Sequence, residues 1–378
     1  MENKTKRHIL SIINYALSET SVEKAFRQQV SVRGKKFRIK GSEYDLGKYE
    51  KIYVLGSGKA SYMMASSLNR ILGRRIDEGL VIYPKKKKNL GRIRVEKGTH
   101  PNPSEQSLES TKKLLRLAGK TTPRDLTIYL LSGGTSSLLC YPSIELKKFI
   151  RLNRDLLKSK RNIKQVNRIR RKYSRVKGGR LVDYIKGRIL NLVVSDVVGD
   201  PLEFIGSGPL YSPGAKKRVR HFVLLNNRML LEKAREKARE LGYRTRIVFP
   251  DYEGTPGKLS LRFRMLAKKL RPGSCLISGG ELASEVRGKG RGGPNQEFVL
   301  RCLGIKAALA SIDSDGLDGN SVAAGAFMDR TDYRYSRETV RKYLRESNSY
   351  EFFRKSGGSI KTGPTGNNLN DLRVMLRN

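Results

Sequence analysis

Short apolar runs alternate with amphipathic stretches along the first 225 residues of the chain. Four runs have the length and the apolar content of buried strands: 51–55, 80–83, 126–131 and 189–194. Four longer stretches carry their apolar residues at helical spacing: 60–72, 107–118, 144–158 and 163–173. Strands that alternate with helices are typical of βαβ units, so the pattern predicts an α/β fold with a largely parallel sheet.

The same alternation resumes after residue 226 and predicts a second α/β unit. Residues 210–226 hold a Ser-Pro-Gly turn and a basic run, and they are the best candidate for a domain boundary in the chain. We therefore expect domains at 1–225 and 226–378. Strands are expected at 244–249, 275–277 and 307–312, and helices at 9–17, 229–241, 261–270, 296–302 and, as a final short helix, within 354–378.

Length and composition exclude several classes of protein. A chain of 378 residues is long enough to bury two hydrophobic cores without disulfides or structural metals. Its three cysteines lack CxxC spacing, which argues against a disulfide framework and for a reducing, cytoplasmic location. Three histidines argue against a His-based zinc site, and no apolar run approaches the roughly 18 residues of a membrane span. We expect no membrane partner, and either a monomer or a homodimer.

The chain is strongly basic, since 78 Lys and Arg against 35 Asp and Glu give a net charge of +43. No acid occurs between Asp155 and Asp183, where basic residues crowd together. Such an excess favours polyanions without specifying one. This stretch has one aromatic residue, Tyr173, so a base-stacking platform is poorly supplied. We expect nucleic acid to bind only non-specifically, although a nucleic-acid-associated basic protein stays an open alternative.

Two glycine-rich turns join a predicted strand to a predicted helix. The first is GSGKA at 56–60, and the second is SGGTSS at 132–137. Such turns gather free backbone N–H groups where a phosphate can bind, and Lys59 would add a point charge. The structural alternative is that the glycines only allow close packing and the hydroxyls only cap a helix. The predicted phosphate-binding residues of these turns are Gly56, Ser57, Gly58, Ser132, Gly133, Gly134, Thr135 and Ser136.

Carboxylates follow two further strands. Asp196 and Asp200 come after the strand at 189–194, and Asp315 follows the strand at 307–312. Phosphoryl transfer needs a carboxylate to hold Mg²⁺ or to orient the attacking hydroxyl, so all three are metal candidates. Aspartates also cap turns, and that structural role stays open for each of them. The run at 313–319 lacks the spacing and the closing glutamate of a calcium loop.

The helix at 163–173 and the Gly-Gly turn after it could bind the substrate. Arg180 follows this turn and could clamp a carboxylate with two hydrogen bonds, although it has many basic neighbours. The predicted substrate-binding residues are Ser136, Asn167, Arg170 and Lys177. Further anion-binding positions are predicted at Ser207, Gly208, Gly292, Gly293 and Asn295.

A dinucleotide site is the alternative to a phosphate site for the first turn. A dinucleotide fold places an acid at the carboxyl end of its second strand to hold the ribose. Here Asp77 and Glu78 precede that strand, and Pro84 and Lys85 follow it. The missing acid argues against NAD, whereas lysines at this place would tolerate NADP.

A series of short motifs stands in a fixed order along nearly the whole chain: GSGKA (56–60), THPNPSEQS (99–107), LSGGTSSLL (131–139), NRIRRKYSRVKGGRL (167–181), SDVVGDP (195–201), SGP (207–209), SGGE (278–281), GRGGPNQE (290–297), DSDGLDG (313–319), AAGA (323–326) and GPTGNNLNDL (363–372). Taken together, they resemble the glycerate kinase family whose C-terminal half is called the MOFRL domain. Any one motif is weak, but the ordered series is specific.

The resemblance implies ATP- and Mg²⁺-dependent phosphorylation of D-glycerate, at the 2-hydroxyl to give 2-phosphoglycerate, in non-phosphorylative Entner–Doudoroff metabolism. It implies two Rossmann-like domains with mostly parallel sheets and an active site in the interdomain cleft. Lys59 matches the lysine proposed as catalytic in the family, and we assign Asp196 and Arg180 beside it. Position 294 is proline where many relatives have arginine, so a role of that arginine is not transferred. The alternative implied by the family is an NAD(P)H-dependent hydroxypyruvate reductase.

Overall fold

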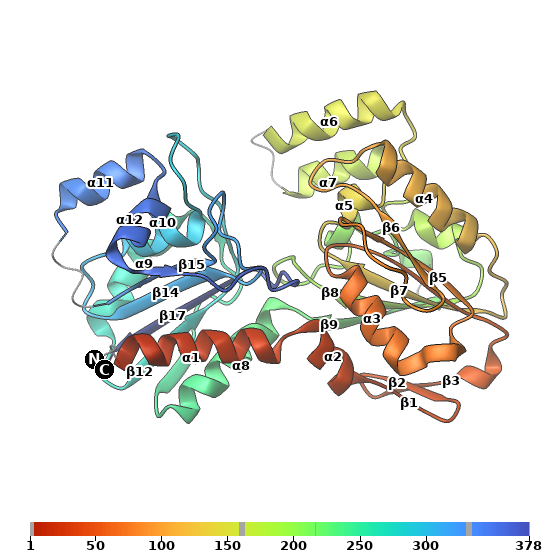
Figure 1. Ribbon diagram of the computed structural model, residues 1–378, viewed down its shortest axis with the longest axis horizontal. Helices are drawn as coiled ribbons and strands as arrows, with labels where there is room; N and C mark the ends of the chain where they lie inside the picture. The colour runs from red at the N-terminus through yellow and green to blue at the C-terminus, as the bar shows by residue number, and fades with distance from the viewer. Residues whose placement is uncertain (1–3, 159–162, 216, 330–334, 378) are drawn as a thin grey trace. The chain divides into compact units, whose positions relative to one another are not determined.

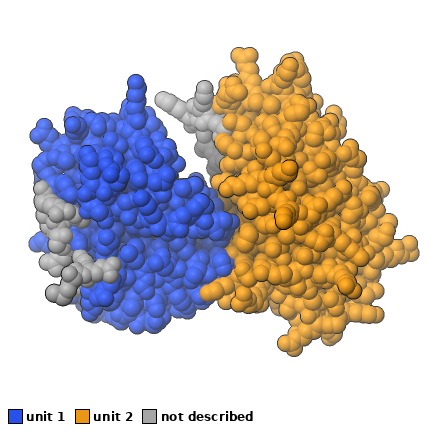
Figure 2. Space-filling view, in the orientation of Figure 1, with its two compact units in different colours: residues 1–21, 226–378 blue, residues 22–225 orange. Residues whose placement is uncertain are grey.

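The computed structural model describes residues 4–158, 163–215, 217–329 and 335–377. The chain forms two compact units, which are coloured separately in Figure 2. Residues 22–225 form one, which we call the inserted unit, and residues 1–21 with 226–378 form the other, which we call the terminal unit. In the part of the chain that is described, no helix has both the length and the apolar content to span a membrane.

The inserted unit is built on a six-stranded sheet in which every neighbouring pair is parallel. Within this sheet the first strand is the inner strand β4. From there the chain continues to β5 and β6 on one side, then returns to β7 on the other side of β4 and continues to β8 and β9. This gives the spatial order β6-β5-β4-β7-β8-β9, that of a doubly wound nucleotide-binding fold. The strands are β4 (Ile52–Ser57), β5 (Glu78–Tyr83), β6 (Ile93–Lys97), β7 (Leu126–Ser132), β8 (Arg188–Val194) and β9 (Val219–Leu225). The parallel sheet predicted for this part of the chain is confirmed.

Amphipathic helices pack on this sheet. In α4 the Ser104 hydroxyl accepts a hydrogen bond from the Ser107 N–H and so caps the helix start. Leu114 and Leu115 of this helix join the core beneath, with Tyr129 and Leu131 of β7. The helices are α2 (Val22–Gln29), α3 (Ser61–Leu72), α4 (Glu105–Ala118), α5 (Thr135–Leu138), α6 (Leu146–Lys158) and α7 (Ile163–Lys172), and a small antiparallel sheet comprises β1 (Val30–Arg33), β2 (Lys36–Ile39) and β3 (Ser42–Asp45) (Figure 1).

The sheet of the terminal unit is mixed, which differs from the prediction of mostly parallel strands. Its order is β10-β12-β17-β14-β15-β16, and only β10 and β12 pair in parallel. Strand β17 lies between β12 and β14 and runs antiparallel to both, and β15 likewise runs antiparallel to its neighbours β14 and β16. The strands are β10 (Arg244–Ile247), β12 (Ser274–Ser278), β14 (Ala308–Asp313), β15 (Gly325–Met328), β16 (Ser359–Ile360) and β17 (Asp371–Arg377), with a separate pair of β11 (Glu253–Gly254) and β13 (Glu281–Leu282).

Strand β17 replaces the final short helix that the sequence predicted. Leu372, Val374, Met375 and Leu376 are all buried, because the strand is covered on both faces of the sheet. A strand buried on both faces shows no alternation of apolar and polar residues, so its pattern does not separate it from a helix. Leucine, methionine and arginine also favour helices. The prediction for this segment was wrong.

The first helix belongs to the terminal unit, although the predicted domain limits placed it with residues 1–225. Helix α1 buries Ile9, Ile12 and Ile13 and packs on α8 and β17. His8 Nδ1 lies 2.9 Å from the Tyr243 hydroxyl. This contact joins residues far apart in sequence, so spacing alone could not reveal it. The helices of this unit are α1 (Lys4–Glu19), α8 (Asn227–Glu240), α9 (Pro256–Lys269), α10 (Pro294–Arg301), α11 (Arg337–Arg345) and α12 (Ser349–Ser356) (Figure 1).

Candidate active site

The loops that follow β4, β7 and β8 lie at the carboxyl edge of the parallel sheet. The winding direction reverses between β4 and β7, which are hydrogen-bonded neighbours. Doubly wound sheets bind their ligands outside the carboxyl ends of the strands at such a switch point. The two turns that the sequence singled out, 56–60 and 132–137, therefore flank the place where this fold binds ligands.

These turns interlock through close backbone contacts. The Lys59 N–H donates to the Gly133 carbonyl at 2.7 Å, and the Ala60 N–H donates to the Ser132 hydroxyl at 3.0 Å. A Cβ placed on Gly133 would lie 2.0 Å from Asp196 Oδ2, so only glycine allows this approach. The structure thus brings together Lys59, Gly133 and Asp196, which come from the ends of three different strands.

A chain of hydroxyl and amide groups lies beside these residues. The Ser136 and Ser207 hydroxyl oxygens are 2.8 Å apart, and the Ser207 hydroxyl donates to Asn167 Oδ1 at 2.8 Å. Since Ser207 donates to the amide, the Ser136 hydroxyl donates to Ser207 and keeps its lone pairs for a ligand. Three residues that the sequence predicted separately are therefore one hydrogen-bonded group.

His100 joins this site, and sequence reasoning did not select it. A Cβ on Gly134 would lie 3.1 Å from both His100 Cδ2 and Lys59 Cγ, so the two side chains flank this glycine. Desolvation, with repulsion from Lys59 and Arg170, lowers the pKa of His100 to about 4. The imidazole is therefore neutral at pH 7. His100 comes from the loop after β6, and no spacing relates it to the glycine turns.

Two buried cations lie next to the hydroxyl chain. Arg170 is 8% exposed and donates through Nε to Asn153 Oδ1 at 2.9 Å. Lys177 is fully buried and donates through Nζ to the Leu139 carbonyl at 2.7 Å. Within the described ranges neither side chain forms an ion pair with a carboxylate.

These two cations create a positive potential, and no acid in the part of the chain that the structure describes pairs with them. Desolvation lowers the pKa of Lys177 to about 8; the Cys140 thiol opposes this shift and the charge of Arg170 adds to it. Desolvation also lowers the pKa of Arg170. Burial of unpaired charge is costly, and an anionic ligand would relieve that cost. The pair is therefore suited to hold an anion.

Arg180 has a structural position. Its Nη1 donates to the carbonyl oxygens of Arg171 at 2.6 Å, Ser174 at 2.9 Å and Lys177 at 3.2 Å. It thus caps the carboxyl end of α7 and the turn after it, where cations are favourable. The carboxylate clamp that we predicted for Arg180 has no support in these contacts, and Arg170 is the better placed cation.

Asp196 is the carboxylate nearest to the glycine turns. Burial raises its pKa, while the Lys59 cation and a backbone hydrogen bond act in the opposite direction. Asp200 lies in the same loop with φ of +55°, and Asp315 belongs to the terminal unit. Among the residues that the structure describes, no group of three or more His, Cys, Asp or Glu side chains could hold a metal ion. A single carboxylate is still enough when substrate phosphates complete a magnesium site.

The predicted anion cradle of the terminal unit is occupied by protein groups. The Asn295 and Gln296 N–H groups at the start of α10 donate to the two oxygens of Asp318, at 3.1 and 2.9 Å. The Gly292 N–H donates to Asn320 Oδ1 at 2.8 Å. Burial raises the pKa of Asp318 to about 7, and its hydrogen bonds to Gln296 and Asn295 oppose the shift. The capping carboxylate stands where we predicted a phosphate.

Four other predicted residues serve packing in this structure. The Ser57 hydroxyl is buried and lies 2.8 Å from the Tyr129 hydroxyl, and the Thr135 hydroxyl donates to the Ser57 carbonyl at 2.8 Å. A Cβ on Gly56 would lie 2.8 Å from the Leu130 carbonyl. The Gly208 carbonyl accepts from the Gly179 N–H at 2.7 Å. Ser57, Thr135 and Gly56 therefore support the two glycine turns, whereas Gly208 supports the turn at Gly179.

Comparison with known proteins places the chain in a family. Two family models match it: a domain of unknown function (DUF4147) over residues 8–241 and the MOFRL family over residues 274–371. Glycerate 2-kinase of Pyrococcus horikoshii is 32% identical, over 92% of this chain and 90% of that protein. The chain belongs to the glycerate kinase family. D-glycerate 2-kinase of Thermotoga maritima is 29% identical, over 86% of this chain and 91% of that protein.

The fold agrees with this family. The crystal structure of a glycerate kinase from Thermotoga maritima superposes with a TM-score of 0.86 at 26% identity, covering 99% of both chains. In this member of the glycerate kinase family, Pro294 stands at the position where the sequence comparison of motifs expected an arginine. Pro294 begins α10, where proline is favourable because the first N–H of a helix has no partner.

Proposed function

We propose that the chain is an ATP-dependent kinase that phosphorylates D-glycerate at its 2-hydroxyl and so produces 2-phosphoglycerate. The observation that carries the proposal is the buried pair of Arg170 and Lys177, which has no acidic partner among the described residues. Glycerate is a small anion with a carboxylate for this pair and hydroxyl groups for its neighbours. The names of the relatives support the same substrate.

In the proposed binding mode the glycerate carboxylate lies near Arg170. Arginine is suited to this task because its guanidinium group forms two parallel hydrogen bonds with a carboxylate. The Ser136 hydroxyl, already oriented by Ser207, would bind a hydroxyl group of the substrate. Glycerate would then be held by groups that the fold positions before it binds, so little ordering is needed on binding.

The transfer step needs positive charge at the phosphoryl group and a carboxylate at the hydroxyl. The 2-oxygen of glycerate attacks the γ-phosphorus of ATP, and the bond from this phosphorus to the bridging oxygen of ADP breaks. The proton of the hydroxyl passes to Asp196, whose raised pKa favours its acceptance. The Lys59 ammonium group neutralises charge on the moving phosphoryl group. The neutral His100 adds no competing charge.

The donor set after β8 also fits Mg²⁺. A magnesium site commonly combines one or two carboxylates with phosphate oxygens, and the loop offers Asp196 and Asp200. We assign Asp200 to the metal, because Asp196 is assigned to the hydroxyl. When bound, Mg²⁺ offsets negative charge on the phosphates of the nucleotide.

The reductase alternative receives no support from the fold. In a dinucleotide site the ribose-binding acid stands at the carboxyl end of the second strand. Strand β5 has Glu78 at its start and ends at Tyr83, which Pro84 and Lys85 follow. No acid therefore stands at the position where NAD would need one, and the NADPH form of the alternative is tested directly below.

Phosphorus NMR of a mixture of protein, ATP, Mg²⁺ and D-glycerate tests the proposal. The expected result is loss of ATP with growth of the 2-phosphoglycerate signal. A 3-phosphoglycerate signal would contradict the assigned position, and unchanged ATP would contradict the kinase. A parallel sample with hydroxypyruvate and NADPH should show no fall in absorbance.

A further inference from the structure

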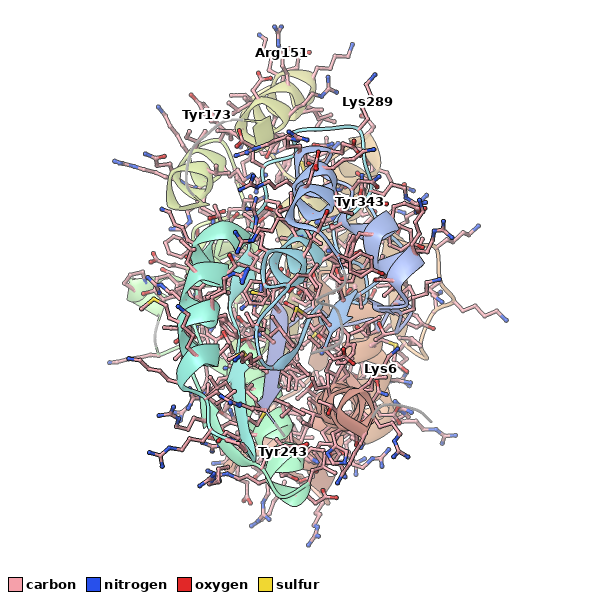
Figure 3. All side chains as sticks on the ribbon, turned by 90° about the vertical axis from the view of Figure 1, so that its left-hand side faces the viewer. Lys6, Arg151, Tyr173, Tyr243, Lys289 and Tyr343 are labelled. Atoms are coloured by element: carbon pink, nitrogen blue, oxygen red, sulfur yellow. The ribbon has the colours of Figure 1, made fainter. Side chains whose placement is uncertain are left out.

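A hollow of about 680 Å³ lies along strand β10 of the terminal unit, and none of the residues assigned above to phosphoryl transfer lines it. The consecutive residues 243–246 all contribute, so the hollow follows the edge of the strand rather than one face of the sheet. Its other residues come from the last turn of α8, the end of α9 and strand β12. The lining comprises Arg239, Tyr243 (labelled in Figure 3), Arg244, Thr245, Arg246, Leu266, Lys269, Leu270, Arg271, Ser274 and Leu276.

Strand β10 has an unpaired outer edge. Within the described part of the chain it is the last strand of its sheet and pairs only with β12. The N–H groups of Arg244 and Val248 donate to carbonyls on the β12 side, at 2.9 and 2.8 Å. Because successive residues of a strand present their backbone groups in opposite directions, those of Thr245 and Ile247 lie on the outer side. An edge of this kind can pair with a further strand.

The hollow is positively charged, because no acid lines it and five cations do: Arg239, Arg244, Arg246, Lys269 and Arg271. None of the five forms an ion pair with another described residue. Glu240, which follows Arg239 in α8, pairs with Lys237 instead. A second hollow, at the start of α9, also has cations, but its lining includes Glu285 and Glu297, and each of these is in an ion pair. The hollow at β10 therefore favours an anionic partner more strongly.

Two arginines of β10 lie on the same face of the sheet. In the register with β12, Arg246 lies beside Leu276, which belongs to the core that α9 covers. Arg244 comes two residues earlier and so projects to the same side. Its Nη2 donates to the Pro272 carbonyl at 2.9 Å, and the guanidinium keeps further N–H groups for a partner. A strand added to this edge would place every second side chain opposite these arginines.

From these features we propose that the hollow binds an extended acidic segment of a partner protein, which joins the sheet as a strand beside β10. Backbone hydrogen bonds would supply affinity. Acidic residues two positions apart would supply specificity, since they would pair with Arg244 and Arg246. A second copy of this chain does not fit, because pairing of two β10 edges would bring like charges together. The proposal is independent of the proposed kinase activity.

The test uses a fluorescent hexapeptide of alternating glutamate and threonine. Its binding is measured by fluorescence anisotropy at about 150 mM salt, where long-range attraction is largely screened. Arg246→Glu and Arg271→Glu should each weaken binding at least about tenfold, because each replaces an attraction by a repulsion. Both residues are exposed, so both variants should fold, and the midpoint of thermal unfolding checks this. Bound peptide should also slow amide hydrogen exchange at Thr245 and Ile247.

Arg337→Glu is the matched control, since Arg337 is an exposed arginine of the same unit and does not line the hollow. It makes the same change of charge and should leave peptide binding unchanged. A fully N-methylated form of the peptide keeps the negative charge but cannot donate backbone hydrogen bonds. This form should not bind.

The proposal is overturned if the peptide does not bind the unmodified chain, or if the N-methylated form binds equally well. It is also overturned if exchange at Thr245 and Ile247 does not change, or if Arg337→Glu weakens binding as much as Arg246→Glu does. A single-stranded DNA hexamer that binds as tightly as the peptide, with the same loss in Arg246→Glu, would overturn it too. The hollow would then recognise negative charge alone.

Discussion

At the scale of single residues, Lys59 is positioned by its backbone. Its N–H group is bonded to Gly133, and its side chain lies along Gly134 beside His100. Lys59→Ala should lower kcat about 10²- to 10³-fold, the usual effect of losing one group that stabilises transition-state charge. The midpoint of thermal unfolding should change little, because the Lys59 side chain is only half-buried. Turnover equal to that of the unmodified chain would refute the assignment; Lys85→Ala, on an exposed residue, is the control.

Lys177 gives a prediction about pH. Its pKa is about 8 in the folded chain and about 10.5 when unfolded, so below pH 8 both states are protonated and burial of the charge opposes folding. Between these values only the unfolded state binds the proton, and the free energy of unfolding should rise with pH by roughly 3 kcal/mol in total. Lys177→Met should lack this rise. Urea unfolding of both proteins at pH 7–10 measures this. The prediction is wrong if the free energy of unfolding changes with pH by the same amount in both.

Residue roles were harder to predict than residue types. The glycine turns and Asp196 could be found because they follow recognisable strands, and the structure does bring them together. His100 and the capping role of Asp318 could not, because each depends on a contact between segments that are distant in sequence. Arg180 was selected for its chemistry, yet the nearest acceptors are carbonyl groups of its own loop.

At the scale of elements, β17 carries a buried ion pair into the middle of a sheet. Arg373 and Asp371 pair with each other, and Asp371 also accepts from Asn295 Nδ2 at 2.6 Å and from the Leu282 N–H at 2.8 Å. Arg373→Met would leave a buried carboxylate without its cation, at a cost of about 3–5 kcal/mol. Adding Asp371→Asn should recover part of this. Urea unfolding measures both variants; equal stability of the single variant and the unmodified chain would disprove the pairing argument.

The same strand shows where pattern reasoning succeeds and fails. Continuous apolar runs correctly located β7 (Leu126–Ser132) and β8 (Arg188–Val194), since both are bounded by turn residues. In β17 an arginine interrupts the run, and its countercharge comes from Asp371 within the same strand. Sequence cannot show that such a pair is buried. The contact of α1 with α8 is hidden for a related reason, because α8 lies far along the chain.

At the scale of the whole molecule, the net charge of +43 should act without sequence preference. Long basic side chains project outward, with Arg151 on α6 and Lys289 before α10 as examples in Figure 3. Of the basic stretch between Asp155 and Asp183, residues 159–162 lie outside the described residues. Two unrelated DNA duplexes should bind equally and lose about 10³-fold or more in affinity between 50 and 200 mM salt. A persistent preference for one duplex, measured by fluorescence anisotropy, would point to a specific nucleic-acid function.

The insertion of one unit within the other has a consequence for synthesis on the ribosome. Everything that residues 22–225 need for their sheet is present once β9 has emerged. The other sheet must wait for β17, which supplies the central strand between β12 and β14. Helix α1 therefore leaves the exit tunnel before the inserted unit, whereas its partner α8 emerges only after that unit and its other partner, β17, emerges later still. Its apolar stripe stays uncovered while the whole inserted unit is synthesised, so the nascent polypeptide should need a chaperone at this helix during that time.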